Sequence, residues 1–439
     1  MERPIWFVPG RPTSPEGPLA RYRPLEPAGA AAEYVRQLTD PGDLVLDLFC
    51  QGPVFLRETV QAGRRALGVS VNPISLLVAG LGLGQMPDPA ALNAAFTRLA
   101  DSPKGEVPLR HHLTSLYQTR CPVCEAEGAA EWFAWDREAG YPYAKAVRCP
   151  RCGETREGPT NEADIAAARR LRPRGLAYHY ALNRVAPVGH PARERAAELV
   201  ELYTTRNLSA LMDVALRLEG LDLERPVRAS LQGLLLSTFD RGSSLDPHGE
   251  VRPRPRVLRP PARFLERNVW LLLEEGLARL VARPDGENVS APRAPGLSAL
   301  LGDRAPAYGL VPCAAREVDG LLPPGSVSLI LADPPRPDGV FWALCALWAG
   351  WLWNSPLAHA MRPFLRRRRF DWEWHQRALR AALTAAAPLL TPGGHLVTLF
   401  VEPDEGLLES VCLASAGAGY EPAGWGASPE VGCRLVWRR

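Results

Sequence analysis

The chain has 439 residues, of which 46% are apolar and 23% are charged. These proportions are typical of globular proteins and exclude a chain that is disordered throughout. The formal net charge of +3 is too small to indicate a nucleic-acid partner by itself. No stretch approaches the roughly 20 apolar residues that cross a bilayer, and no basic segment followed by an apolar run opens the sequence, so we expect a cytoplasmic protein without membrane contact.

The first hundred residues alternate between apolar runs and helical patterns. Residues 43–49 (DLVLDLF) form an apolar run of strand length, and residues 54–62 form a helical pattern. A second apolar run at residues 65–71 is followed by Asn72-Pro73, a pair typical of a helix start. Strand, helix, strand and helix in this order open a doubly wound α/β sheet, so we predict a Rossmann-like fold.

The pattern changes after residue 100 and returns near residue 306. Residues 101–160 hold two pairs of cysteines, and residues 161–305 are mainly helical in pattern. Residues 306–439 again contain strand and helix signals, and they end in a stretch that fits a closing hairpin. We therefore predict one α/β domain, formed by residues 1–100 and 306–439, that is interrupted by a long insertion.

Two cysteine pairs of equal spacing lie in the insertion, Cys121-Pro-Val-Cys124 and Cys149-Pro-Arg-Cys152. Tetrahedral zinc takes four thiolates, and a gap of two residues lets both cysteines of a pair reach one ion. The pattern predicts a zinc ribbon in which the metal is structural, because four cysteine ligands leave no open position for catalysis. Redox-active thiols or chance pairs are the alternative interpretation.

Two predicted strands end in segments with polar groups, and ligands of doubly wound sheets bind at the carboxyl ends of the strands. These segments are residues 41–53 (PGDLVLDLFCQGP) and residues 329–340 (LILADPPRPDGV). Residues 41–50 resemble the S-adenosylmethionine (SAM) motif of amino-group DNA methyltransferases. Residues 329–340 resemble the D-P-P-Y-Y-D-N-V segment of adenine-specific DNA methylases that contain a zinc ribbon. The resemblance begins near residue 25 and includes shorter segments at residues 68–73, 202–208 and 266–270.

The resemblance implies a SAM-dependent DNA methyltransferase that modifies the exocyclic amine of a flipped base, adenine N6 or cytosine N4. In that family the aspartate of the catalytic segment and the carbonyl beside the first proline accept hydrogen bonds from this amine. The implied catalytic residues are Asp333, Pro334, Pro335 and Arg336. The implied contacts with SAM are Asp47, Phe49, Cys50, Gln51, Gly52, Ser70, Asn72 and Cys313. Residues 161–305 are then the place for target recognition.

Four parts of this pattern depart from the family. The loop at residues 51–53 (QGP) replaces G-S-G, which adds a side chain and removes an N–H where the backbone approaches SAM. Ser70 replaces the acid that holds the ribose, and Cys313 aligns with an aspartate of the family. Arg336 replaces the aromatic residue that stacks on the base, although a guanidinium plane can also stack.

The departures leave two functions open. One is an active SAM-dependent DNA methyltransferase with a variant loop. The other is a methyltransferase-like protein that has lost catalysis and serves as a nucleic-acid-binding or partner subunit. Methylation of RNA is a third, less favoured alternative.

A basic run follows the catalytic segment and alternates with aromatic residues. Arginine beside aromatic side chains suits contact with phosphates together with stacking on bases. We predict that nucleic acid is contacted by Arg366, Arg367, Arg368 and Arg369. A solvated charge run is the alternative.

Overall fold

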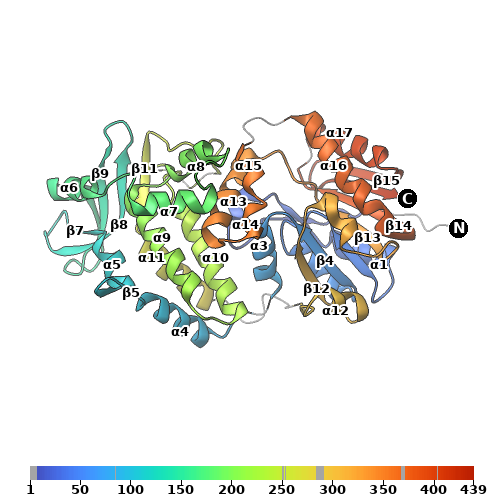
Figure 1. The fold of residues 1–439 in the computed structure, drawn as a ribbon, viewed down its shortest axis with the longest axis horizontal. Coiled ribbons are helices and arrows are strands. Elements are labelled where there is room, and N and C mark those ends of the chain that lie inside the picture. The colour runs from blue at the N-terminus through green and yellow to red at the C-terminus, as the bar shows by residue number, and fades with distance from the viewer. Residues whose placement is uncertain are drawn as a thin grey trace. The chain divides into compact units, whose positions relative to one another are not determined.

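The computed structural model describes residues 7–84, 86–249, 252, 254–282, 291–366, 371–402 and 404–439. The chain divides into two compact units, each made of stretches that are separate in the sequence (Figure 1). Unit 1 is formed by residues 1–85, 285–339 and 367–439, and unit 2 by residues 86–284 and 340–366. The predicted α/β class is confirmed, because helices and strands alternate around the sheet of unit 1.

Unit 1 is built on a seven-stranded sheet with the order β12-β4-β3-β13-β14-β16-β15. The first five strands of this order run parallel, and β16 and β15 form an antiparallel hairpin at the edge. Numbered along the chain, the strands lie in the order 3-2-1-4-5-7-6. Their bounds are β3 Leu44–Asp47, β4 Arg65–Ser70, β12 Tyr308–Pro312, β13 Val327–Ala332, β14 Leu390–Phe400, β15 Glu421–Ser428 and β16 Gly432–Arg438.

Both faces of this sheet are covered, which explains why the central strands β3 and β13 consist mainly of apolar residues. Leu44 and Leu46 of β3 pack in one core with residues of α16 and α17. Val45, which points to the opposite face, packs with Tyr34 of α1 and Phe55 of α2. The helices of unit 1 are α1 Ala30–Leu38, α2 Val54–Gln61, α3 Pro73–Leu83, α12 Leu297–Gly302, α16 Trp372–Ala386 and α17 Glu405–Gly417. Shorter elements are β1 Arg11–Thr13, β2 Glu26–Ala28 and the 3-10 turns η1 Ala20–Tyr22, η2 Ala315–Gly320 and η3 Ala387–Leu389.

Polar side chains fix the starts of two helices beside the sheet. The Asn72 side chain accepts a hydrogen bond from the backbone N–H of Ile74 at 3.1 Å, so the predicted helix start is confirmed as the N-cap of α3. The Glu58 carboxylate accepts hydrogen bonds from the N–H groups of Gly29 and Ala32, which have no partner inside α1. A residue of α2 therefore caps α1 and holds the N-terminal segment against the sheet.

Unit 2 contains a five-stranded antiparallel sheet with the order β10-β9-β8-β11, in which β7 also pairs with β8. The strands are β7 Gln118–Arg120, β8 Glu127–Asp136, β9 Tyr141–Arg148, β10 Thr155–Pro159 and β11 Arg263–Arg267. The segment between the cysteine pairs forms the antiparallel hairpin of β8 and β9. β11 comes from a distant part of the chain, and its pairing with β8 extends the ribbon into a larger sheet.

Helices make up the rest of unit 2, with a two-stranded ribbon of β5 Pro103–Lys104 and β6 Val107–Pro108. They are α4 Pro89–Ala100, α5 Leu109–Ser115, α6 Glu162–Arg170, α7 Leu176–Val185, α8 Arg193–Val200, α9 Thr205–Gly220, α10 Arg225–Arg241, α11 Val269–Val281, α13 Gly339–Leu352, α14 Pro356–His359 and α15 Arg362–Arg366. Among the described residues of the whole chain, no helix combines the length and the apolar character that crossing a membrane requires.

A buried polar network joins the ribbon sheet of unit 2 to its helices. The Glu266 carboxylate of β11 accepts hydrogen bonds from Trp135 Nε1 at 2.8 Å, from Arg206 Nη1 at 3.1 Å and from the Thr204 hydroxyl. The Arg206 guanidinium lies over the ring of Phe133, 4.5 Å from its centroid. Residues 202–208 and 266–270, two of the shorter segments that resemble the methylase family, therefore contact each other directly.

Candidate functional site

Asp47 and Asp333 meet at the carboxyl ends of two neighbouring strands in unit 1. Asp47 is the last residue of β3, and Asp333 directly follows β13. The strands pair in parallel with Asp47 opposite Leu331, which brings the two aspartates to the same edge of the sheet. The strand order reverses between β3 and β13, and such a switch point is where doubly wound sheets bind ligands.

The Gln51 side chain closes the loop that follows β3 against Asp333. Gln51 Nε2 donates a hydrogen bond to the Asp333 carbonyl at 2.9 Å. The N-terminal segment approaches the same loop, since a Cβ added to Gly52 would lie 2.7 Å from Glu26 Oε1 and 3.1 Å from Arg23 Nη2. A side chain at position 52 would therefore displace the ends of the Arg23–Glu26 ion pair.

The two aspartates line a small cleft together with Arg23, Glu26 and Gln51. The cleft has a volume of about 30 Å³. Two or three water molecules fit into it at roughly 10–15 Å³ each. Pockets for ligands of the size of SAM or a nucleoside have volumes of about 300–1,000 Å³. The cleft between the two aspartates is therefore smaller than such a ligand, and Ser70, Asn72 and Cys313 are not among the residues that line it.

Burial dominates the electrostatics of both carboxyl groups. It raises the pKa of Asp47 to about 8, partly opposed by the hydrogen bond from the Phe49 N–H and reinforced by the nearby charge of Asp333. It raises the pKa of Asp333 to about 7, although the Arg336 guanidinium lowers it. Asp333 Oδ1 is buried and lacks a hydrogen-bond partner among the described residues. An N–H donor from a ligand would satisfy this oxygen.

We expect unit 1 to lose stability as the pH rises from about 4 to about 8. Both carboxyl groups have folded-state pKa values above 3.8, so the folded chain binds more protons than the unfolded chain within this window. The Asp47→Asn variant keeps an oxygen for the Phe49 N–H and removes one titrating group, so its stability should fall less steeply. Thermal unfolding of both proteins across this range measures the difference, and parallel pH profiles would contradict the assignment to Asp47.

The other residues implied in SAM binding lie at the ends of β3, β4 and β12. Cys50 is buried, and its side chain packs against β4. A Cβ added to Gly68 of β4 would lie only 2.9 Å from the Cys50 sulfur. Ser70 ends β4, and its hydroxyl accepts a hydrogen bond from the Asn72 N–H at 3.2 Å. The Cys313 N–H donates to the Ser70 carbonyl at 3.1 Å. Half-buried Phe49 lines the cleft. These residues are brought to one edge of the sheet, but neither Ser70 nor Cys313 supplies an acid there.

Arg336 is held by the segment that follows β14. Its Nη1 donates a hydrogen bond to the Glu402 carbonyl at 2.7 Å, and the Glu402 carboxylate lies 3.8 Å from the same nitrogen. Pro334 is buried, and the neighbouring Pro335 carbonyl lies 2.9 Å from His375 Nε2. The segment 333–336 is therefore anchored at several points. Of the Arg336 guanidinium, only Nη1 is engaged, whereas Nε and Nη2 are buried without a hydrogen-bond partner among the described residues.

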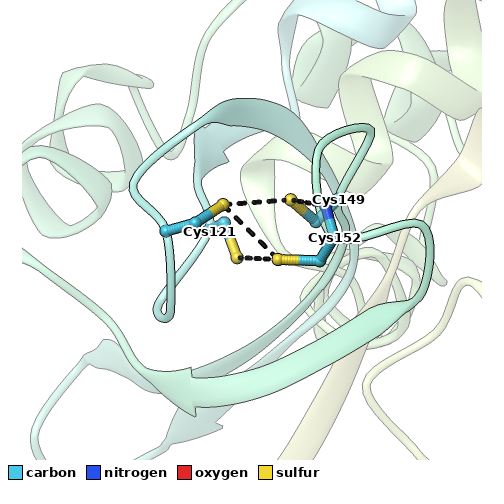
Figure 2. Close-up of side chains that lie close together, drawn as sticks. Cys121, Cys149 and Cys152 are labelled. Carbon is cyan, nitrogen blue, oxygen red and sulfur yellow. Dashed lines mark hydrogen bonds between the residues drawn. The ribbon is translucent and has the colours of Figure 1, made fainter.

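The four predicted metal ligands meet at one point of the ribbon, at the two turns that Figure 2 shows facing each other. Their sulfur atoms all lie within 4.8 Å of one another, and the pairs Cys124–Cys149 and Cys124–Cys152 are 3.4 Å apart. Tetrahedral zinc with bonds of about 2.3 Å places its sulfurs about 3.8 Å apart. The cluster can therefore hold a metal ion such as zinc.

The backbone around the cluster favours thiolates. The Cys152 N–H donates to Cys149 Sγ at 3.3 Å and is the main reason why the pKa of Cys149 falls to about 6. The neighbouring sulfurs of Cys124 and Cys149 raise the pKa of Cys152. The Val123 N–H donates to Cys121 Sγ at 3.5 Å in the first turn. Gly153 has a φ of 74°, a conformation that lets the second turn fold back and that glycine adopts without strain.

Comparison with known proteins adds no assignment to this geometry. No family model, curated protein or solved structure matches the chain. The family resemblance of residues 41–50 and 329–340 therefore stays a prediction.

Two residues that line the cleft were not predicted from the sequence, and most of the predicted arginine patch falls outside the described residues. Arg23 and Glu26 come from the N-terminal segment, where no motif marks them and where the family resemblance only begins. Their position depends on the pairing of β1 with β2 and on the hydrogen bond from the Gly29 N–H to Glu58. Both contacts join residues that are well separated in the sequence. Arg367, Arg368 and Arg369 lie outside the described residues, and Arg366 is described only as the last residue of α15.

Proposed function

We propose that this chain is a nucleic-acid-binding protein on a scaffold of the SAM-methyltransferase type, in which the SAM site is closed. The observation that carries the closed site is the hydrogen bond from Gln51 to the Asp333 carbonyl across a cleft of about 30 Å³. Nucleic acid as the partner follows from the resemblance of residues 329–340 to DNA methylases. The sheet order 3-2-1-4-5 with an edge hairpin supports the scaffold, because it is doubly wound around the switch point between β3 and β13.

Each departure from the family pattern has a physical consequence in this cleft. Gln51 occupies space with its side chain and engages the segment beside Pro334. Ser70 offers a hydroxyl in place of a carboxylate, so two charged hydrogen bonds to a ribose are lost. Such bonds contribute about 1.5–3 kcal/mol each, and their loss weakens binding by a factor of about 100 or more. The site therefore disfavours SAM in two independent ways.

The test is calorimetric titration of SAM and S-adenosylhomocysteine into the zinc-loaded chain. We expect no binding up to millimolar SAM, together with salt-dependent binding of DNA. A double variant, Gln51→Gly with Ser70→Asp, restores the space and the acid and should gain measurable affinity for SAM. Gln61→Gly, which changes an exposed glutamine at the end of α2, is the control and should not. Micromolar SAM binding by the unmodified chain would contradict the closed site.

An active amino-methyltransferase is the second candidate, and the unpartnered Asp333 Oδ1 favours it. This buried acceptor lies beside Asp47 at the switch point, and the exocyclic amine of a base is a donor that would satisfy it. Transfer of labelled methyl groups from SAM to DNA or to RNA distinguishes the candidates. Incorporation that Asp333→Ala abolishes would establish the enzyme and identify its nucleic-acid substrate.

A further inference from the structure

A groove lies beside the cysteine ribbon in unit 2, between the start of β9 and the length of α6. It has a volume of about 730 Å³ and is open to solvent. Its lining combines an aromatic ring, an apolar strip and two exposed arginines. The lining residues are Tyr141, Glu162, Ile165, Ala166, Arg169 and Arg170.

The helix that forms one wall of the groove is firmly anchored to the ribbon. Asp164, near the start of α6, accepts a hydrogen bond from Lys145 Nζ of β9 at 2.6 Å, and both side chains are almost fully buried. The Thr119 hydroxyl contacts both partners, donating to Asp164 Oδ1 and accepting from Lys145. Asp164 also completes the cap of the helix with Asn161. The arginines one to two turns further along α6 are therefore held at a fixed place above β9.

The charge of the groove is predominantly positive. Glu162 is its only acidic lining residue among those described, whereas Arg169 and Arg170 end the helix and Arg172 and Arg174 follow within four residues. The Arg169 guanidinium lies 5.9 Å from the centroid of the Tyr141 ring. Arg174 pairs with Glu201 at 3.0 Å, and in the described part of the chain no carboxylate lies within ion-pair distance of Arg170. The helix dipole also favours cations at a helix C-terminus. That effect alone does not account for the aromatic ring or for the open groove beside the arginines.

We propose that this groove binds a single-stranded segment of nucleic acid, with a base against Tyr141 and neighbouring phosphates at Arg169 and Arg170. An aromatic platform beside arginines matches the chemistry of single-strand binding, in which rings stack on bases and guanidinium groups neutralise phosphates. The volume is sufficient for a nucleotide. The inference rests on the proposed function only in taking nucleic acid as the partner, and it makes no use of residues 366–369.

The test measures fluorescence anisotropy of a labelled oligothymidylate of about 16 nucleotides with the full, zinc-loaded chain between roughly 50 and 200 mM salt. The double variant Arg169→Glu with Arg170→Glu should bind at least about tenfold more weakly. Its slope of log affinity against log salt should fall by about 1.4, since each phosphate contact with a single strand contributes about 0.7. Arg98→Glu with Arg225→Glu makes the same change of charge at exposed positions of α4 and α10 and should leave the slope unchanged.

Variants of the aromatic ring separate stacking from charge. Tyr141→Ala should weaken binding about tenfold, because stacking on an aromatic side chain is lost, whereas Tyr141→Phe should bind like the unmodified chain. If the groove variant and the control variant weaken oligonucleotide binding equally, net charge alone explains the effect. That result would overturn the proposal that the groove is the binding site. Binding by the unmodified chain that the groove variants leave intact overturns this surface but leaves the proposed function standing. Absence of binding to single strands, with or without binding to duplex DNA, overturns the groove as well. Circular dichroism and zinc content confirm that the variants are folded.

Discussion

Replacement of Glu266 by alanine is expected to destabilise unit 2 by about 3–5 kcal/mol, the usual cost of leaving a buried charge unpaired. The Glu266 side chain has no exposed surface, and the Arg206 side chain is only 3% exposed. The carboxylate accepts from three donors, on β8, on α9 and at the N-cap of α9. Its removal leaves the Arg206 guanidinium and the Trp135 N–H buried without their acceptor.

Hydrogen exchange is the appropriate measurement, because a chain of two units need not unfold in one step. Amides of β8, β11 and α9 should exchange faster in Glu266→Ala, while those of the parallel sheet in unit 1 should not change. Glu274→Ala is the matched control, since Glu274 also accepts from a tryptophan, Trp270 Nε1 at 2.8 Å, but is exposed. Its effect should be below about 1 kcal/mol. Equal protection in both variants would show that the network contributes little.

Loss of the metal is expected to unfold the ribbon of unit 2. The four sulfurs lie within 4.8 Å of one another, and each turn that carries them leads to a short outer strand, β7 of three residues or β10 of five residues. Structural zinc contributes about 10–16 kcal/mol to the folding of isolated zinc fingers. We therefore expect one zinc per chain, and Cys149→Ser should abolish it and expose residues 118–159 to proteolysis.

A cysteine outside the cluster provides the control for this experiment. Cys412 of α17 is half-buried and far from the ribbon in the sequence, so Cys412→Ser should keep the full zinc content. Zinc is measured by elemental analysis and by its release to a chelator. A protease-resistant ribbon in a metal-free protein would show that the fold of the ribbon does not depend on a metal ion.

The loss of the ribbon should also reach the groove between β9 and α6. Lys145 and Asp164 form the buried pair that attaches α6 to β9, and β9 ends one residue before Cys149. Protein from which the metal has been removed by a chelator is therefore expected to bind single-stranded nucleic acid more weakly. The reason is the displacement of α6, because the metal itself does not contact the nucleic acid.

Features with a local cause could be read from the sequence. The pairing of Cys121 with Cys124 and of Cys149 with Cys152 depends on a two-residue turn, so spacing alone predicted the cluster. The apolar run that became β3 and the Asn72 cap of α3 are likewise determined within a few residues. These elements were sufficient to predict an α/β sheet with a ribbon inserted into it.

Only the tertiary structure decided which side chains meet at the edge of that sheet. Gln51 was a departure from a motif in the sequence, and the structure places its side chain against the Asp333 carbonyl, with a hydrogen bond of 2.9 Å. Arg23 reaches the same cleft from a segment without any motif. The pairing of β11 with β8, and with it the place of Glu266, depends on strands far apart in the chain. Periodicity and spacing report on neighbours along the sequence, whereas these contacts are fixed by how the strands pair and which faces they bury.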